Sequence, residues 1–448
     1  MKMKLLKHNQ NILIVLGLFL FFFLLRQNQI FFQFKFISIE TDIINSTINY
    51  SNFYLDKQNF FEVFIYFFLL IPGYYLLKSK FNFENTSIFF LYLFFFVPYI
   101  IFFTSIDYQF YRILTNEIIL LEQKDLYLLS FFLYLNLVLL IFLTKIKFDF
   151  KLKYFYVNFK NLKKVLLGLV TIITFVILYN FFFLSDTINI DLHYLLTTKS
   201  NLKALTSGPS GYLYYFTIYI FLPLIYLLEK KRENLIFVLI IYLLLFFFIK
   251  SKIILFFMIS ILTFHYQPLI FSRKLYAKVI KFVLIYLILV FFLSYLMDHF
   301  YQIKTSLFFE RFFLSQTKNL FFVYDNLLVN GPIHLSHIGI LNKSLTLPES
   351  AENFFDLIKR IYGGGSAVSN SYIMDGIASF GLKGLFFVSI LLAILFKLVD
   401  LSINLENSEF RLIYLFQIIG FLSFPLSTHL LTYGLGITIF LGMIKIKR

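Results

Sequence analysis

The chain contains 448 residues, of which 60% are hydrophobic and 14% are charged, and it carries a formal net charge of +16. A soluble domain averages about 25% charged residues, so the composition excludes a soluble globular protein and indicates a polytopic membrane protein. The sequence has no cysteine, which excludes disulfides, thiolate nucleophiles and iron–sulfur clusters. The positive charge does not indicate nucleic-acid binding, because basic residues collect in the cytoplasmic loops of membrane proteins.

The first apolar run, 12–25, follows Lys2, Lys4 and Lys7, as in a signal peptide. Arg26 and polar residues come next, at the place where a signal peptide has small residues for cleavage. We therefore predict an uncleaved first membrane helix with the N-terminus in the cytoplasm.

Eleven further apolar runs follow, and with their flanks they approach the about 20 residues that a membrane-spanning helix needs. They are 60–77, 87–106, 126–144, 165–184, 211–228, 234–249, 253–271, 279–297, 382–399, 410–425 and 430–444. Together the runs predict an all-α polytopic membrane protein, a single integral membrane domain over residues 1–448 with about 12 transmembrane helices. The even number of spans predicts that both termini are cytoplasmic.

The long segment 298–381 separates the apolar runs and carries many of the polar residues of the chain. In the twelve-helix arrangement, the predicted cytoplasmic loops contain 24 of the 40 lysines and arginines, in agreement with the positive-inside rule. That arrangement makes 298–381 one large external loop. Amphipathic patterns near 310–322 and 350–362 predict short helices within it.

Several kinds of site are missing from the sequence. There is no Gly-x4-Gly-Lys-Ser/Thr motif for ATP and no His-Glu-x-x-His motif, so no cofactor and no metal is predicted. His334 and His337 are spaced to share a helical face, but no carboxylate is close by, which favours a surface role over a metal site. Asn136 and Gln417 are the strongest polar groups inside the predicted spans, and this scarcity argues against an ion relay through the membrane.

The first candidate cluster is the turn Lys250, Ser251 and Lys252 between two apolar runs, on the predicted outer side. Two cations there run against the positive-inside trend, and they are suited to bind phosphate or pyrophosphate as point charges. The alternative is that both lysines extend to lipid headgroups.

The second cluster follows Glu310. Arg311, Ser315 and Lys318 fall at i, i+4 and i+7, on one face of a predicted helix. An amphipathic helix lying on the membrane surface would give the same pattern. Arg311 is the residue that we favour for substrate binding, because its planar guanidinium can hold two phosphate oxygens at once.

The third cluster is the run 321–326, in which Tyr324, Asp325 and Asn326 follow three apolar residues. Aromatic rings cover the apolar faces of sugars while carboxylates and amides bind hydroxyls, so the run is suited to sugar recognition. The alternative is chance, since 66 Phe and 31 Tyr are spread over the whole chain.

The fourth cluster follows the glycines at 363–365. Asn370 and Asp375 are predicted at the start of a helix, and the glycines of 376–384 permit close approach of the backbone. Small residues here most often indicate helix packing. An Asp at the outer end of a membrane helix is less common, so Asp375 is a candidate for function.

The order of these clusters resembles that of the bacterial O-antigen and capsular polysaccharide polymerases. The closest match is Asn370, Asp375 and the run Phe380-Gly381-x-x-Gly384. The turn between two helices in this family usually carries an arginine, whereas this chain has Lys250 and Lys252 there.

The resemblance implies a metal-independent glycosyltransferase of the bacterial cytoplasmic membrane that needs no cofactor. It would transfer a growing glycan from one undecaprenyl pyrophosphate carrier to a second lipid-linked oligosaccharide repeat unit. Lys250, Lys252 and Arg311 would hold the pyrophosphate, and either Asp325 or Asp375 would accept the proton of the acceptor hydroxyl. The further residues expected to contact substrate are Lys318, Tyr324, Asn326, His334, His337, Asn370 and Lys383. Membrane lipids, a chain-length regulator and a flippase of the same pathway are the expected partners.

Two other functions fit the same layout. An O-antigen ligase, or another lipid-linked glycosyltransferase, would share the predicted topology. A lipid-linked oligosaccharide flippase belongs to a different class, and it would be expected to show two similar halves and cations within a central cavity. Neither feature is visible in the sequence.

Overall fold

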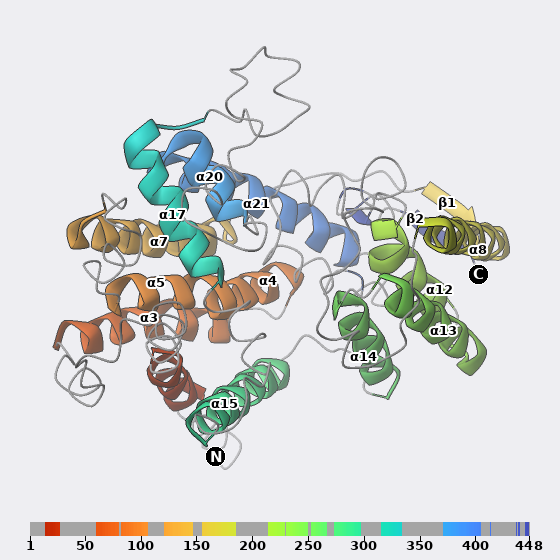
Figure 1. Ribbon diagram of the computed structural model, residues 1–448, viewed down its shortest axis with the longest axis horizontal. Helices are drawn as coiled ribbons and strands as arrows, with labels where there is room; N and C mark the ends of the chain where they lie inside the picture. The colour runs from red at the N-terminus through yellow and green to blue at the C-terminus, as the bar shows by residue number, and fades with distance from the viewer. Residues whose placement is uncertain are drawn as a thin grey trace. The chain divides into compact units, whose positions relative to one another are not determined.

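The computed structural model describes the following residues: 14–26, 60–79, 82–105, 121–146, 155–184, 214–228, 230–249, 252–266, 273–296, 315–333, 371–404, 413, 436, 438–439 and 444–447. The chain forms two compact units (Figure 1). Unit 1 comprises Met1–Lys147 and Phe271–Ile394, and unit 2 comprises Phe148–Ile270 and Leu395–Arg448. The units are described separately below.

Unit 1 is built from long apolar helices. They are the helix Ile14–Arg26, α3 (Phe60–Lys78), α4 (Phe83–Leu91), η2 (Tyr92–Phe96), α5 (Val97–Ser105), α7 (Gln123–Leu143), α15 (Arg273–Leu296) and α21 (Leu382–Asn404), whose last turns belong to unit 2. The π-helical turn η2 joins α4 and α5 into one continuous helix. In this turn the Tyr92 hydroxyl donates a hydrogen bond of 2.8 Å to the Leu69 carbonyl of α3.

Three helices among the described residues are long and apolar enough to cross a membrane: Phe83–Thr104, Gln123–Leu143 and Leu382–Leu401. Shorter apolar helices cover Ile14–Arg26, Phe64–Lys78 and Tyr214–Leu227. The expectation of a helical membrane protein is therefore confirmed by length and composition. The count of twelve spans stays a prediction, and the last two predicted spans lie almost entirely outside the described residues.

A buried polar contact joins two of these membrane helices. Asn136 of α7 is fully buried, and its amide Nδ2 donates a hydrogen bond of 2.7 Å to the Leu385 carbonyl of α21. The Ser389 hydroxyl, also buried, donates to Asn136 Oδ1 at 2.7 Å. Since water is absent from the core of a bilayer, polar groups there have to be satisfied within the protein. The polar side chain noted in the sequence thus fixes α7 against α21.

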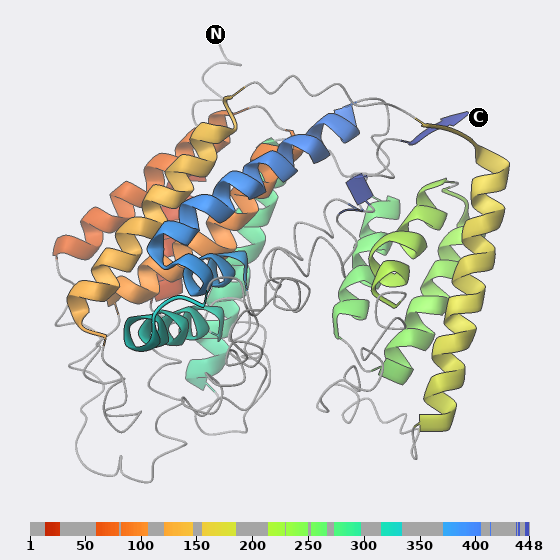
Figure 2. The same ribbon diagram turned by 90° about the horizontal axis from the view of Figure 1, so that it is seen from above.

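Two shorter helices lie at one end of this bundle, α17 (Ser315–Asn330) and α20 (Tyr372–Phe380). Figures 1 and 2 show α17 running across the direction of α5 and α7, near the end at which α7 begins. The part of the predicted helix near 310–322 that falls on described residues is confirmed from Ser315 onward. The pattern at 350–362 lies outside the described residues.

Lysines and tyrosines mark the opposite end of the bundle. Lys78, at the end of α3, lies over the ring of Tyr74 at 4.3 Å from its centroid. Lys145 follows α7 and lies over the ring of Tyr75 at 4.5 Å, so the ends of α3 and α7 are neighbours. Both of these lysines belong to loops that the sequence predicts to be cytoplasmic.

Unit 2 contains α8 (Phe159–Leu184), η3 (Thr217–Phe221), α12 (Leu222–Leu228), α13 (Arg232–Ile249) and α14 (Lys252–Tyr266). The two apolar runs on either side of residue 251 are confirmed as the helices α13 and α14, which pack on each other. The Tyr242 hydroxyl of α13 donates a hydrogen bond of 2.6 Å to the Ile218 carbonyl in η3.

One short sheet departs from the all-α expectation. β1 (Phe155–Asn158) pairs in parallel with β2 (Ile444–Lys447), with Phe155 opposite Ile444. The prediction had Phe155 in a loop and Ile444 at the end of a span. β1 contains two aromatic residues and a valine, and β2 alternates isoleucine with lysine; both kinds of segment favour a strand where a partner is present. Each strand has its partner almost 300 residues away in the sequence, so the pairing could not be predicted from the residues around either strand.

Candidate functional site

The site is built on a helix corner formed by glycines. α20 begins at Ser371, whose hydroxyl accepts a hydrogen bond of 3.4 Å from the Met374 N–H, and it ends at Gly381. Gly381 has a φ of +65°, a conformation that side chains with a Cβ rarely adopt. A Cβ added at Gly376 would lie 2.8 Å from the Gly384 carbonyl oxygen, and one added at Gly384 would overlap the Gly376 carbonyl. The predicted close approach is confirmed: α20 folds back against the first turn of α21.

α17 is fixed to α20 through the backbone. Gly331, with a φ of +74°, ends α17 and donates a hydrogen bond of 2.9 Å to the Leu327 carbonyl. The Ile333 N–H then donates to the Ala378 carbonyl of α20, also at 2.9 Å. This bond sets the position of α17 beside α20, and the two predicted clusters meet as one helix pair.

Asp325 is fully buried on α17, and its Oδ1 accepts a hydrogen bond of 3.0 Å from the Leu121 N–H. Leu121 precedes the first residues of α7, so this bond joins segments that are 204 residues apart in the sequence. A hydrogen bond from a backbone N–H to a carboxylate is about twice as strong as one to a neutral acceptor. Asp325 therefore anchors α17 to the start of the membrane helix α7.

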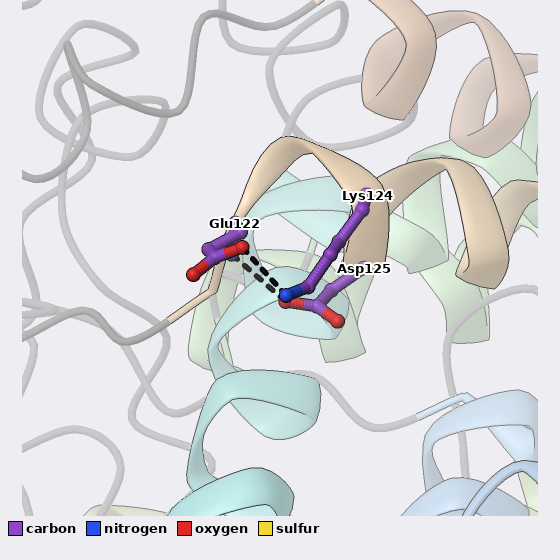
Figure 3. A network of polar contacts seen from close by, with 3 residues as sticks. All are labelled: Glu122, Lys124 and Asp125. Atoms are coloured by element: carbon purple, nitrogen blue, oxygen red, sulfur yellow. Dashed lines mark hydrogen bonds and ion pairs between the residues drawn. The ribbon is translucent and has the colours of Figure 1, made fainter.

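The start of α7 carries its own charged network (Figure 3). Asp125 Oδ2 accepts a hydrogen bond of 2.9 Å from the Glu122 N–H, which caps the helix. Lys124 Nζ lies 2.8 Å from Glu122 Oε2, and both side chains are exposed. An exposed ion pair contributes little stability, so the capping bond is the contact that defines this end of α7.

Two tyrosines of the helix pair are buried. Burial, and to a lesser extent the Asp125 carboxylate, raises the pKa of Tyr324 to about 12. Burial and the neighbouring Tyr99 raise the pKa of Tyr372 well above its ordinary value. Both phenols thus stay protonated at physiological pH and remain hydrogen-bond donors. The Tyr372 hydroxyl has no hydrogen-bond partner among the described residues.

Asn326 of α17 and Asp375 of α20 are also buried. The Asn326 Oδ1 accepts a hydrogen bond of 2.8 Å from Asn330 Nδ2, one turn further along α17. Asp375 lies in the first turn of α20 with 6% of its surface exposed. This place at the N-terminus of α20 puts Asp375 where the helix dipole interacts favourably with a negative charge.

Of the predicted site residues, the structure brings Tyr324, Asp325, Asn326 and Asp375 together on the α17–α20 pair. Lys383 follows in the first turn of α21 and is exposed, and Lys318 lies in the first turn of α17. Lys252 begins α14 in unit 2. The predicted residues outside the described part of the chain are Lys250, Arg311, His334, His337 and Asn370.

Sequence reasoning did not point to Tyr372, Asp125 or the backbone of Leu121. Tyr372 follows Ser371 at the start of α20, and its ring lies 6.0 Å from that of Phe95 in η2. The spacing of Ser371 before an apolar helix was a visible capping signal, and it would have predicted that Tyr372 is the first helical residue. No signal in the sequence connects Leu121 to Asp325.

Across the residues that the structure describes, no group of three or more His, Asp or Glu side chains is arranged to hold a metal ion. No family model matches the chain, and neither a curated protein nor a solved structure is significantly similar to it. The class of protein is therefore defined by the fold alone. It is a helical membrane protein in which two adjacent short helices, α17 and α20, carry buried carboxylates, an amide and phenols at one end of a helix bundle.

Proposed function

We propose that this protein polymerises oligosaccharide repeat units linked to undecaprenyl pyrophosphate, at the outer face of a bacterial cytoplasmic membrane. The proposal includes twelve spans, cytoplasmic termini and an external 298–381 segment. The glycan product would be an O-antigen or a capsular polysaccharide. The reaction would need no metal and no cofactor, because a pyrophosphate leaving group already stores the energy for glycosyl transfer.

The observation that carries the proposal is the α17–α20 pair with Asp325, Asn326 and Asp375 buried in it. Burying a carboxylate is costly unless hydrogen bonds compensate for the lost water. Ionisable residues inside membrane spans commonly mark functional sites, and we extend this reasoning to the buried carboxylates at this end of the bundle. Carboxylates, amides and phenols are also the groups that bind sugar hydroxyls.

The two carboxylates have different roles in this proposal. Asp325 is a positioning residue, because its carboxylate accepts the Leu121 N–H and holds α17 in place. Asp375 is the proposed general base, because it lies in the first turn of α20, where the helix N-terminus interacts favourably with a carboxylate. The buried phenols of Tyr324 and Tyr372 keep their protons and serve as hydrogen-bond donors.

The proposed step is a displacement at the anomeric carbon of the donor sugar. A hydroxyl of the acceptor repeat unit attacks that carbon while Asp375 takes the proton of the hydroxyl. The bond between the sugar and the pyrophosphate oxygen breaks, and its electron pair leaves with the pyrophosphate. Arg311 is proposed to stabilise the developing charge on the leaving group. Holding donor and acceptor in line supplies much of the rate enhancement.

Deletion of the gene in its native strain, followed by analysis of the surface glycan, tests this function. We expect single repeat units on the lipid or on the core, and no long chains. Polymer stranded on its carrier would instead indicate a ligase, and repeat units that never reach the surface would indicate a flippase. Long surface polymer in the deletion strain, with no second polymerase gene present, would refute the proposal.

Complementation of the deletion strain separates catalysis from folding. Asp375→Asn should lower the yield of long chains at least a hundredfold at normal protein level, in line with the about 10²–10⁴-fold contribution of a general base. Glu122→Gln is the matched control, because it makes the same chemical change at an exposed position at the same end of the bundle. Equal chain lengths in both variants would remove Asp375 from the mechanism.

A further inference from the structure

A groove in unit 1 runs between α15 and the continuous helix formed by α4 and η2. Its volume is about 300 Å³, at the lower end of the about 300–1,000 Å³ typical of ligand sites. Phe90 and Phe94 form one side, one helical turn apart, with their rings stacked and the centroids separated by 6.0 Å. The groove is therefore walled by aromatic rings on the α4–η2 side.

The other side of the groove is a stripe along α15. Lys278, Phe282 and Tyr286 follow one another at intervals of four residues, with Val279 and Val283 beside them. Residues four apart lie above one another on a helix, so the lysine stands at one end of an apolar channel and the tyrosine at the other. Phe282 is 69% exposed, which shows that this channel opens to the surroundings of the protein.

The two helices are fixed to each other beside the groove. The ring of Tyr276 stacks on that of Phe89 with the centroids 4.0 Å apart, and its hydroxyl shares a hydrogen bond of 3.1 Å with Thr86. The N-terminal ends of α4 and α15 therefore lie side by side. A groove with walls held in this way is formed before any ligand binds, which lowers the entropic cost of binding.

The charges of α15 give the groove a direction. Every lysine and arginine of this helix lies in residues 273–281, and the remaining turns to Leu296 carry no charge. Lys278 lies within that basic segment and also lines the groove. The channel thus leads from a basic helix end into a purely apolar part of the helix.

We propose that this groove binds an anionic phospholipid. The phosphate lies against Lys278, and one acyl chain follows Phe282 toward Tyr286 between the aromatic walls. The lysine is a point charge suited to a phosphate, and basic pockets between membrane helices are typical sites for acidic headgroups. This site does not depend on the proposed polymerase activity, because it uses none of the residues of α17 or α20.

The test measures lipid retention by native mass spectrometry. The full-length protein is equilibrated in detergent with equal amounts of phosphatidylglycerol and phosphatidylcholine of identical acyl chains. We expect preferential retention of one phosphatidylglycerol. Lys278→Gln should weaken this retention about fivefold, which corresponds to the about 1 kcal/mol that one lysine near an anionic lipid surface contributes. Lys281→Gln is the matched control, because Lys281 is exposed on the same helix but does not line the groove.

A second pair of variants tests the apolar channel. Val279→Trp should fill the groove and abolish retention of the lipid, whereas Ile285→Trp, at a 47% exposed position outside the groove, should leave retention unchanged. Equal retention of the two lipids by the unaltered protein would overturn the proposal. The same holds if Lys278→Gln and Lys281→Gln retain phosphatidylglycerol equally.

Discussion

The two ends of the unit 1 helix bundle treat charged side chains in different ways. Where α3 and α7 end, Lys78 and Lys145 lie over tyrosine rings. Where α7 and α21 begin, Asp325 is buried on the short helix α17 and Asp375 on the short helix α20. A lysine at a helix end can reach water along its own stem, so it needs no supporting structure. A buried carboxylate needs hydrogen-bond donors or a favourable dipole. The Leu121 N–H donates to Asp325 on α17, and the N-terminus of α20 favours the negative charge of Asp375.

The end with the buried carboxylates has the more elaborate local structure of the two. It contains two capped short helices, two glycines with positive φ and a hydrogen bond across 204 residues. At the lysine end, Lys78 contacts the Tyr74 ring of its own helix and Lys145 contacts the Tyr75 ring of α3. Precise positioning is a property of sites that must hold a substrate, which is why we assign the function to α17 and α20.

The largest expected contrast is in accessibility. Because the chain has no cysteine, single cysteines can be introduced at Asn330, in the exposed last turn of α17, and at Lys145, at the opposite end. In intact cells we expect a membrane-impermeant thiol reagent to label Asn330→Cys fully and Lys145→Cys only after permeabilisation. Labelling of both positions in intact cells would show that the two ends are not separated by the membrane.

The next largest effect should come from Gly384→Ala. The added Cβ would overlap the Gly376 carbonyl, a backbone atom that no side-chain rotation can move away. Overpacking usually costs about 1–3 kcal/mol, and we expect the upper part of that range, measured as loss of folded protein on heating in detergent. Gly168→Ala is the control, since its Cβ would meet nothing within 4 Å. Equal stability of the two variants would mean that α20 does not fold back on α21.

A smaller effect is expected for Asp325→Ala, which leaves the Leu121 N–H buried without its acceptor. An unsatisfied buried donor costs about 1–3 kcal/mol, and we expect about 2 kcal/mol in the same heating assay. Asp325→Asn keeps an oxygen at this position and should retain both most of the stability and some polymer synthesis. If Asp325→Asn folds normally but makes no polymer, Asp325 is the catalytic base and not a positioning residue.

Much of this fold could be predicted from the sequence because its signals are local. Apolar runs gave the helices α3, α7, α13, α14 and α21 within a few residues of their observed bounds. Asn136 stood out as a polar residue inside a span, and it is buried in an interhelical contact. The glycines at 376, 381 and 384 predicted a close backbone approach, and the structure contains it.

The rest depends on contacts between distant segments. The β1–β2 pair joins two segments that are far apart in the sequence, and their pairing makes them strands. Asp325 reads in the sequence as a free acid beside aromatics, whereas its carboxylate accepts the Leu121 N–H. The sequence leaves the choice between Asp325 and Asp375 open, because only the fold determines which one supports the backbone.

The π-helical turn η2 has a consequence for how relatives of this chain would align. A π-turn holds one more residue than an α-turn, and it absorbs this residue without rotating the helix on either side. Thr86 before the turn and Tyr99 after it therefore keep the neighbours that an uninterrupted α-helix would give them. A homologue that lacks one residue within 92–96 would fold as a plain α-helix with both faces in register. We expect single-residue gaps at this place to be tolerated in evolution, whereas a gap elsewhere between 83 and 104 would turn one half of the helix away from its partners.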